Sequence, residues 1–185
     1  MVFIERITTE DILKVHEIQK LGFEKLYRKY GDKESPYNET SEDFLRKFNR
    51  PNNYMFLVKN YKESIGYIRV VTTDQRDQAR IAPIVILPEY ENLGLGKKVM
   101  QLVEMEFNTV KEWHLETILQ ESRLIHFYTQ MGYKQENITP IQNGMDEVSF
   151  IKFFKKRYLT TGSHNLDDQN INKRKYQMRT VASIV

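Results

Sequence analysis

Two glycines stand two positions apart in residues 91–100, Glu-Asn-Leu-Gly-Leu-Gly-Lys-Lys-Val-Met. They follow an apolar, strand-like run and precede a run with helical spacing. The first amides of a helix have no partner within the helix, and the helix dipole adds partial positive charge there. Glycines let a bulky anion approach the backbone, and Lys97 and Lys98 add positive charge. The stretch therefore indicates a phosphate site, with a plain strand-to-helix turn as the alternative.

Two better-known phosphate motifs do not match this stretch. A Walker A loop requires Ser or Thr directly after Gly-Lys, whereas Lys97 is followed by Lys98. The dinucleotide-binding fingerprint requires a third glycine at the position where Val99 stands. A phosphate bound here would therefore depend on a different kind of loop.

A proline interrupts the strand-like run before the glycines. Because proline cannot donate to a sheet ladder, Pro83 implies a strand edge, a strand start or a bulge. The run is the third strand of an expected antiparallel meander, which makes a bulge plausible, and an ordinary edge is the equal alternative. Bulges are frequent beside active sites because they redirect backbone groups.

The second stretch that could do chemistry is the expected helix over residues 122–131. Its Tyr128 can donate a proton to a strongly basic leaving group such as a thiolate, since a tyrosine has an ordinary pKa near 10. The alternative is a core aromatic residue whose hydroxyl is satisfied. One face of this helix consists of Leu124, Phe127, Tyr128 and Met131.

Strands and helices that alternate along the chain must position these residues. Two helices follow a first strand, three strands form a meander, and helices and strands then alternate. Residues 137–144, which include Pro140, are expected to form a loop. This order predicts an α+β fold around one mixed sheet. The expected strands cover residues 2–7, 54–59, 64–72, 80–87, 114–120, 133–135 and 147–154, and the expected helices cover residues 8–30, 40–48, about 95–110 and 122–131.

The composition indicates one globular domain. The chain has 185 residues, of which 40% are hydrophobic, and it contains no cysteine, which excludes disulfides and thiolate metal sites. No signal-peptide pattern and no apolar run long enough to cross a membrane is present, so we expect no membrane association and a cytoplasmic location.

The positive charge is concentrated near the C-terminus. The formal net charge is +3, and seven Lys or Arg but only two Asp lie from residue 155 onward. We expect one domain over residues 1–155 and a basic tail over residues 156–185 that is either disordered or packed on the surface. Its short basic clusters lack an aromatic RNA-binding motif, so we do not expect nucleic-acid binding.

Together, the two chemical stretches resemble the Gcn5-related N-acetyltransferase (GNAT) family. In that family a Val-x-Pro-like strand end leads into Gln/Arg-x-x-Gly-x-Gly/Ala, and here Ile-Leu-Pro at residues 86–88 leads into residues 91–96. The family often continues with Asn-x-x-Ala-x-x-x-Tyr-x-x-x-Gly-Phe, and residues 121–133 keep Tyr128 and Gly132 of that pattern. The order of elements from residue 2 to about residue 154 also looks like that of the family.

The resemblance implies a fold, a cosubstrate and a reaction. The fold would be a three-layer, mostly antiparallel sheet flanked by helices, with splayed central strands beyond Pro83. The cosubstrate would be acetyl-CoA, an amine would attack its thioester directly, and Tyr128 would protonate the departing thiolate. Family members are often dimeric, so a homodimer is implied as an option. The residues implied to bind the cosubstrate are Ile84, Val85, Ile86, Leu93, Gly94, Leu95, Gly96, Lys97 and Glu121.

Three positions depart from the family pattern. Glu91 replaces Gln or Arg, and its carboxylate would repel a pyrophosphate unless it points away. Glu121 replaces Asn, and Leu124 is bulkier than the usual Ala. The departures at Glu91 and Glu121 suggest an alternative, a non-catalytic CoA-binding or regulatory module with the same fold.

The general base is expected on the strand that follows the first glycine-led helix. Direct attack needs a neutral amine, so a group must accept a proton, and Glu116 is the best candidate. His114 and His126 are expected to be structural or solvated. No pair of histidines has the spacing of metal ligands, so no metal is expected.

The resemblance places the acceptor amine between two loops, residues 31–39 and 136–146. Glu34, Tyr37 and Glu39 could attract a cationic amine there, and a solvated loop is the alternative. The acceptor could be a small molecule or a protein amine.

Overall fold

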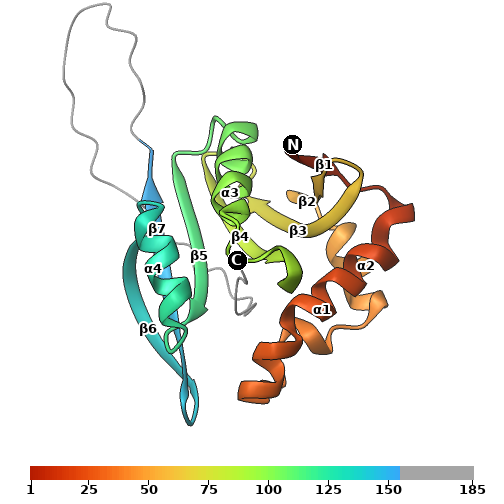
Figure 1. The fold of residues 1–185 in the computed structure, drawn as a ribbon. Helices are drawn as coiled ribbons and strands as arrows, with labels where there is room; N and C mark the ends of the chain where they lie inside the picture. Colours follow the sequence, from red (N-terminus) through yellow and green to blue (C-terminus); the bar gives the residue numbers. More distant parts are fainter. Residues whose placement is uncertain (155–185) are drawn as a thin grey trace, which may run out of the picture.

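A computed structural model describes residues 1–154 of the chain, and the expected basic tail lies outside this range (Figure 1). One seven-stranded sheet forms the centre, in the order β1-β2-β3-β4-β5-β7-β6. Neighbouring strands are antiparallel except for the parallel pair β4–β5. The mixed, mostly antiparallel sheet expected from the sequence is therefore confirmed. The strands are β1 (Val2–Arg6), β2 (Asn53–Asn60), β3 (Glu63–Thr72), β4 (Gln78–Ile86), β5 (Glu112–Ile118), β6 (Lys134–Gln142) and β7 (Met145–Phe153).

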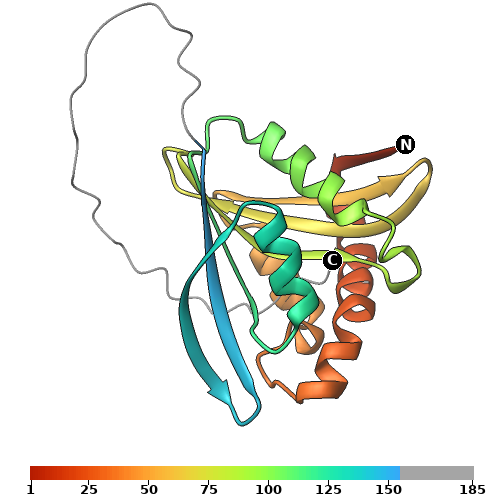
Figure 2. The ribbon, with the colours of Figure 1, turned by 60° about the vertical axis from the view of Figure 1, so that its left-hand side comes forward.

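Helices cover both faces of the sheet. Helices α1 (Ile12–Tyr30) and α2 (Ser41–Phe48) pack on one face, whereas α3 (Leu95–Glu106) and α4 (Ser122–Gln130) pack on the other (Figures 1 and 2). The two apolar clusters on either side of the sheet are separate. The result is a three-layer α+β domain in which α4 covers the β5–β7 part of the sheet.

Local sequence signals account for the helix ends. Helix α2 begins with a reciprocal capping box, because the amide of Asp43 donates to Thr40 Oγ1 (3.1 Å) and the amide of Thr40 donates to the Asp43 carboxylate (3.2 Å). Helix α1 ends at Gly31, whose φ of 62° is the left-handed conformation that glycine adopts without strain. These caps fix the loop at residues 31–40 that joins the two helices.

Strand β4 contains the bulge that Pro83 suggested. Ile68 pairs with Ile84 but Val70 pairs with Ile81, so two residues of β4, Ala82 and Pro83, lie opposite one residue of β3. The buried guanidinium of Arg69, the residue opposite them, donates to the Ala82 carbonyl. The bulge therefore lies in the middle of the sheet.

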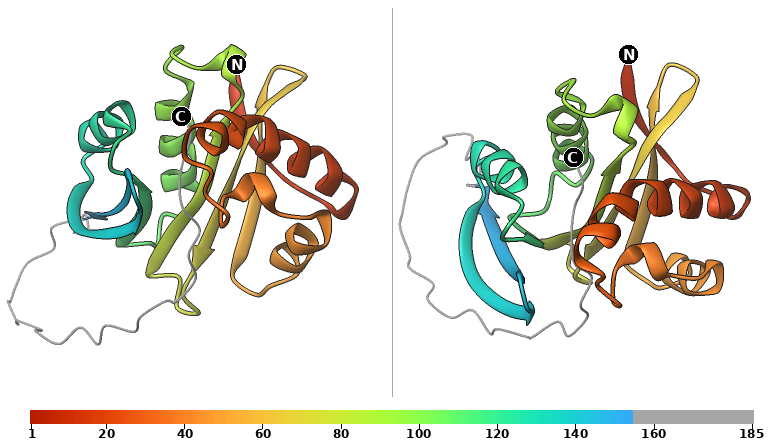
Figure 3. Two further views of the ribbon diagram at one scale, coloured as in Figure 1. Left: turned by 90° about the horizontal axis from the view of Figure 1, so that it is seen from below. Right: turned by 60° about the horizontal axis from the view of Figure 1, so that its bottom comes forward.

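The sheet splits beyond this bulge. Strand β4 pairs with β5 only over Gln78–Arg80 and Glu112–His114, whereas β5 continues to pair with β7 along its full length. Within residues 1–154, the backbone edge of β4 that faces β5 has no strand partner from residue 81 onward. The two parts of the sheet diverge from this point, as the views in Figure 3 also indicate.

One predicted loop is instead a strand. Residues 137–142, expected as a loop, belong to β6, which forms a hairpin with β7 around residues 143–144. Strand β6 is the edge of the sheet and almost wholly exposed, so it shows no alternation of apolar and polar residues. Proline is tolerated on an edge strand, which explains why Pro140 does not break this one.

Candidate functional site

The glycine loop supplies unpaired amides at the start of α3. Gly94 is the N-cap and has a φ of 70°, and the first bond of the helix runs from the Lys98 amide to the Gly94 carbonyl (3.4 Å). Within the described residues, the amides of residues 92–97 donate no hydrogen bond. A Cβ atom added at Gly94 would meet nothing within 4 Å, so the loop is open on that side. These amides have the geometry of an anion site.

The unpaired edge of β4 leads directly into this loop. Ile84, Val85 and Ile86 pair with β3 on one side and have buried side chains. Their other backbone edge lies along the split in the sheet. An extended ligand could therefore pair with β4 as an additional strand and place a phosphate at the start of α3.

Two glycines allow close packing around this part of β4. A Cβ atom at Gly22 of α1 would lie 2.3 Å from Val85 Cγ1, and one at Gly66 of β3 would lie 2.1 Å from the Val85 carbonyl oxygen. A larger residue at Gly22 would displace the Val85 side chain, and one at Gly66 would displace the β4 backbone. Helix α1 and strand β3 thus hold β4 closely from two sides.

The candidate acid Tyr128 lies on the α3–α4 side of the sheet. It is fully buried, and its ring packs near Phe127, Tyr133 and Phe150 with centroid distances of 5.0, 6.1 and 5.7 Å. The structure buries the whole Tyr128 side chain, including the hydroxyl oxygen.

The candidate base Glu116 lies on β5 and points to the opposite face, toward the side covered by α1 and α2. Its carboxylate is 3.4 Å from Arg80 Nη1, and its side chain is 20% exposed. Burial raises the pKa of Glu116, although the charges of Arg80 and His114 oppose this effect. A raised pKa makes the carboxylate a stronger proton acceptor.

Tyr128 and Glu116 therefore lie on different faces of the β5–β7 part of the sheet. Trp113 and Leu115 of β5 belong to the same apolar cluster as Tyr128, and Glu116 alternates with them along the strand.

Glu121, implied as a cosubstrate contact, is engaged by α1. Its carboxylate accepts hydrogen bonds from Lys29 Nζ and Tyr30 Oη, both at 2.6 Å. Burial alone would raise the pKa of Glu121, but the bonds from Lys29 and Tyr30 together hold it below its usual value. The carboxylate thus joins the start of α4 to the end of α1.

The structure accounts for the unexpected Glu91. Its carboxylate lies 3.0 Å from Arg123 Nη2, and Arg123 Nη1 donates to Asn92 Oδ1 (3.4 Å). Arg123 could not be predicted as a site residue, because it is distant from Glu91 in the chain. The only indication in the sequence was Glu91 itself, because a carboxylate beside a phosphate site requires a nearby cation.

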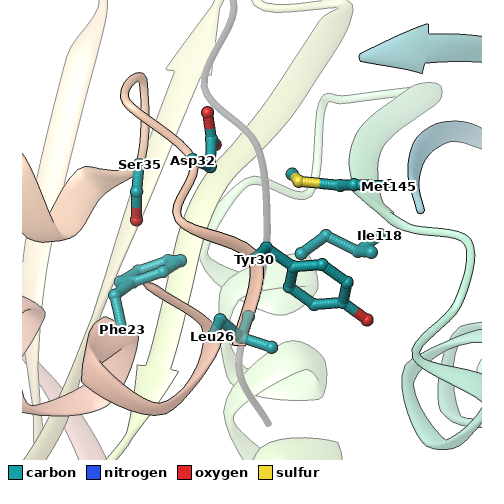
Figure 4. Close-up of a pocket in the computed structure, with 7 residues that line it drawn as sticks. All are labelled: Phe23, Leu26, Tyr30, Asp32, Ser35, Ile118 and Met145. Carbon is teal, nitrogen blue, oxygen red and sulfur yellow. The ribbon is translucent and has the colours of Figure 1, made fainter. Parts of the chain in front are cut away.

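A small pocket lies on the α1–α2 side, next to the end of β5 (Figure 4). It is a shallow depression that is partly open to solvent, with an interior about large enough for one water molecule. Its charged residue is Asp32, which is buried and accepts one hydrogen bond from the Glu34 amide (3.0 Å). The pocket is lined by Phe23, Leu26, Tyr30, Asp32, Ser35, Ile118 and Met145.

The three acceptor residues suggested by the sequence have different surroundings. Glu34 is exposed. Tyr37 stacks on Tyr27 with a centroid distance of 4.5 Å. Glu39 pairs with Lys47 and accepts from Gln19 (3.1 Å), so its carboxylate is occupied by structural contacts. None of the three lines the pocket, whereas Asp32 in the same loop does.

The remaining observations concern histidines, metals and membranes. His114 pairs with Glu112 (2.7 Å), and His126 is exposed. Within residues 1–154, no three His, Asp or Glu side chains gather into a group that could hold a metal. None of the described helices has the length and apolar character needed to cross a bilayer.

A split sheet, an unpaired strand edge and free helix amides are together the arrangement expected of a protein that binds an extended, phosphate-bearing ligand. The chain belongs to the acetyltransferase (GNAT) family, whose model matches residues 14–133. No curated protein matches the sequence significantly.

Solved structures with the same fold include three N-acetyltransferases. The ribosomal-protein-S18-alanine N-acetyltransferase from Escherichia coli has a TM-score of 0.67 and 16% identity, over 86% of this chain and 99% of that chain. The PaiA N-acetyltransferase from Thermoplasma acidophilum, in complex with coenzyme A, has a TM-score of 0.66 and 18% identity, over 83% and 99%. The spermidine N-acetyltransferase from Vibrio cholerae, in complex with CoA and spermine, has a TM-score of 0.66 and 14% identity, over 82% and 95%.

Proposed function

We propose that this protein transfers the acetyl group of acetyl-CoA to a primary amine by direct attack, with Tyr128 as general acid and Glu116 as general base. Family membership supports the acetyl transfer. The amine acceptor and the roles of the two residues are inferred from the site. A cytoplasmic location and a possible homodimer remain expectations from the sequence.

The residues fit acetyl-CoA as cosubstrate because two separate backbone surfaces match its two parts. The unbonded amides of residues 93–97 suit the pyrophosphate, with Lys97 adding positive charge. The free edge of Ile84–Ile86 suits the amides of the pantetheine arm. When bound, acetyl-CoA supplies an activated thioester.

The two side chains divide the proton transfers. Glu116 accepts a proton from the attacking amine, directly or through water, since only a neutral amine is nucleophilic. The amine nitrogen forms a bond to the thioester carbonyl carbon as the carbon–sulfur bond breaks. Tyr128 donates its proton to the departing sulfur, so the products are an amide and free CoA. No covalent bond to the protein forms.

The depression beside β5 is the proposed contact for one end of the acceptor. Ile118 of its lining lies two residues beyond Glu116 on the same face of β5, which places the pocket next to the candidate base. Its apolar walls and the buried Asp32 suit an amine that has an apolar part and a second cationic group. Spermine in the spermidine N-acetyltransferase complex is a polycationic example from a relative.

The observation that carries the proposal is the free edge of β4 that runs into free amides at α3. A screen of primary amines for thiol release from acetyl-CoA tests it. We expect release with at least one small diamine or amino-terminal peptide, and a product whose mass increases by one acetyl group. A protein that binds CoA but releases no thiol with any amine of a broad panel would instead be a CoA-binding module.

That non-catalytic alternative has one specific observation in its favour. The Glu121 carboxylate is bonded to Lys29 and Tyr30, so a family contact to the cosubstrate is replaced by a structural link. The backbone amides of the loop are unaffected by this link. The alternative therefore predicts CoA binding without turnover.

A further inference from the structure

We propose that Arg123 is a phosphate-binding residue for the cosubstrate and that Glu91 is its competitor, which holds the guanidinium in the absence of ligand. This inference rests on the proposed function, since it concerns the same ligand. It assigns a binding role to a side chain of α4, outside the glycine loop.

The geometry places the Arg123 guanidinium beside the glycine loop. Nη2 is 3.0 Å from the Glu91 carboxylate and Nη1 is 3.4 Å from Asn92 Oδ1. Both partners directly precede the amides of residues 93–97 that would hold the pyrophosphate. Arg123 therefore lies at the loop, although it comes from α4, which packs on the β5–β7 part of the sheet.

The chemistry favours an exchange of partners. A guanidinium forms strong, paired hydrogen bonds with phosphate as well as with carboxylate. The Arg123 side chain is 47% exposed, so it can turn without loss of core packing. The Glu91 carboxylate is 18% exposed, and its negative charge lies close to the arriving phosphates. A pyrophosphate at the loop amides would draw the guanidinium away from Glu91.

This exchange has a signature that a purely structural ion pair lacks. Removal of the cation should weaken CoA binding, whereas removal of the carboxylate should strengthen it. If the pair only fixed the shape of the loop, both changes would weaken binding. The two single substitutions should thus act in opposite directions.

The test measures CoA binding by isothermal titration calorimetry for the wild type, Arg123→Gln, Arg123→Lys, Glu91→Gln and the double variant. We expect Arg123→Gln to weaken CoA binding about tenfold or more, Arg123→Lys to restore part of the loss, and Glu91→Gln to tighten binding about threefold. The control Arg46→Gln removes another exposed Arg–carboxylate pair, with Asp43 on α2, and should leave binding unchanged.

Pantetheine, which has no phosphate, is the second probe. Its inhibition constant against acetyl-CoA turnover should be the same in all variants, because both side chains lie at the phosphate end of the proposed site and do not contact the pantetheine arm. Thermal melts of each variant establish that it is folded. Weaker CoA binding by Glu91→Gln, or unchanged binding by a folded Arg123→Gln, would overturn the inference and leave the proposed function intact. Failure of the wild type to bind CoA would overturn both.

Discussion

Among the single residues of the candidate site, Glu116 has surroundings that suit it to accept a proton. The side chain is mostly buried beside the split in the sheet, and burial raises its pKa above the usual carboxyl value despite Arg80 and His114. Because the deprotonated form is the active one, activity should fall as the pH drops through this raised pKa.

We therefore predict that Glu116→Gln lowers kcat/KM about 100-fold and removes the acidic limb of the pH–rate profile. The matched control is Glu112→Gln on the same strand and face, which should keep the limb. Rates of both variants are measured from pH 5 to 9. An acidic limb that persists in Glu116→Gln would exclude Glu116 as the base.

The proposed role of Tyr128 as the acid can be tested by removal of its hydroxyl group alone. Tyr128→Phe keeps the ring contacts with Phe127, Tyr133 and Phe150 but removes the proton that the departing thiolate needs. Turnover should fall about 100-fold while CoA affinity stays within about twofold. Tyr133→Phe is a matched control, because Tyr133 is also buried and its hydroxyl donates to Glu104 (3.3 Å). Equal rates in Tyr128→Phe and the wild type would remove Tyr128 from the mechanism.

The acceptor pocket gives a third prediction. Asp32→Asn keeps the size of the side chain but removes the buried negative charge that would attract a cationic group. We expect KM for a diamine acceptor to rise about tenfold, with a smaller effect on a monoamine. Glu34→Gln, an exposed position in the same loop, is the control. A diamine KM that is the same in Asp32→Asn as in the wild type would place the amine site elsewhere.

At the scale of secondary-structure elements, the site depends on a strand that is paired on one side and free on the other. Gly22 and Gly66 let α1 and β3 approach Val85 closely, and the bulge at Ala82–Pro83 marks where β4 leaves β5. These features position the edge of β4 without a contact to any ligand.

We predict that Gly22→Ala destabilises the protein by about 1–3 kcal/mol, because the added methyl group would lie 2.3 Å from Val85 Cγ1. The double variant Gly22→Ala with Val85→Ala makes room for that methyl group, so it should lose less stability than the two separate losses combined. Urea unfolding measures both effects. Strictly additive losses would show that Gly22 and Val85 do not interact.

The elements differ in how well the sequence predicts them. The capping box of Thr40 with Asp43 and the helix end at Gly31 are determined by nearby residues. The sequence therefore predicts these helix ends accurately. The bulge was suggested by Pro83 for a similar reason. The β6 strand could not be found, since an exposed edge strand has no hydrophobic alternation and Pro140 resembles a loop signal.

The sequence predicts only those parts of the candidate site that depend on neighbouring residues in the chain. The glycine loop and Tyr128 carry their signal in nearby residues. The Glu91–Arg123 pair and the bonds of Glu121 to Lys29 and Tyr30 join residues that are far apart in the chain. The role of Asp32 likewise depends on β5 and β7, which complete the pocket. Such contacts form only when the elements pack together, and the periodicity and spacing of the sequence do not specify that packing.

At the scale of the whole molecule, two parts of one sheet are joined along a short stretch and diverge beyond it. One part holds β1–β4 and the other holds β5–β7, and the candidate acid and base both belong to the second part. A ligand that pairs with β4 and contacts α4 would connect the two parts. Binding should therefore stabilise the whole described domain.

The most direct test of cosubstrate binding is the melting temperature with and without acetyl-CoA. At a concentration 100 times Kd, a ligand that binds only the folded state contributes about 2.7 kcal/mol, which corresponds to an increase of roughly 5–10 °C for a chain of this size. We predict an increase of this order for acetyl-CoA and CoA, and none for adenosine at the same concentration. An unchanged melting temperature at millimolar acetyl-CoA would contradict the claim that β4 and the amides of residues 93–97 bind this cosubstrate.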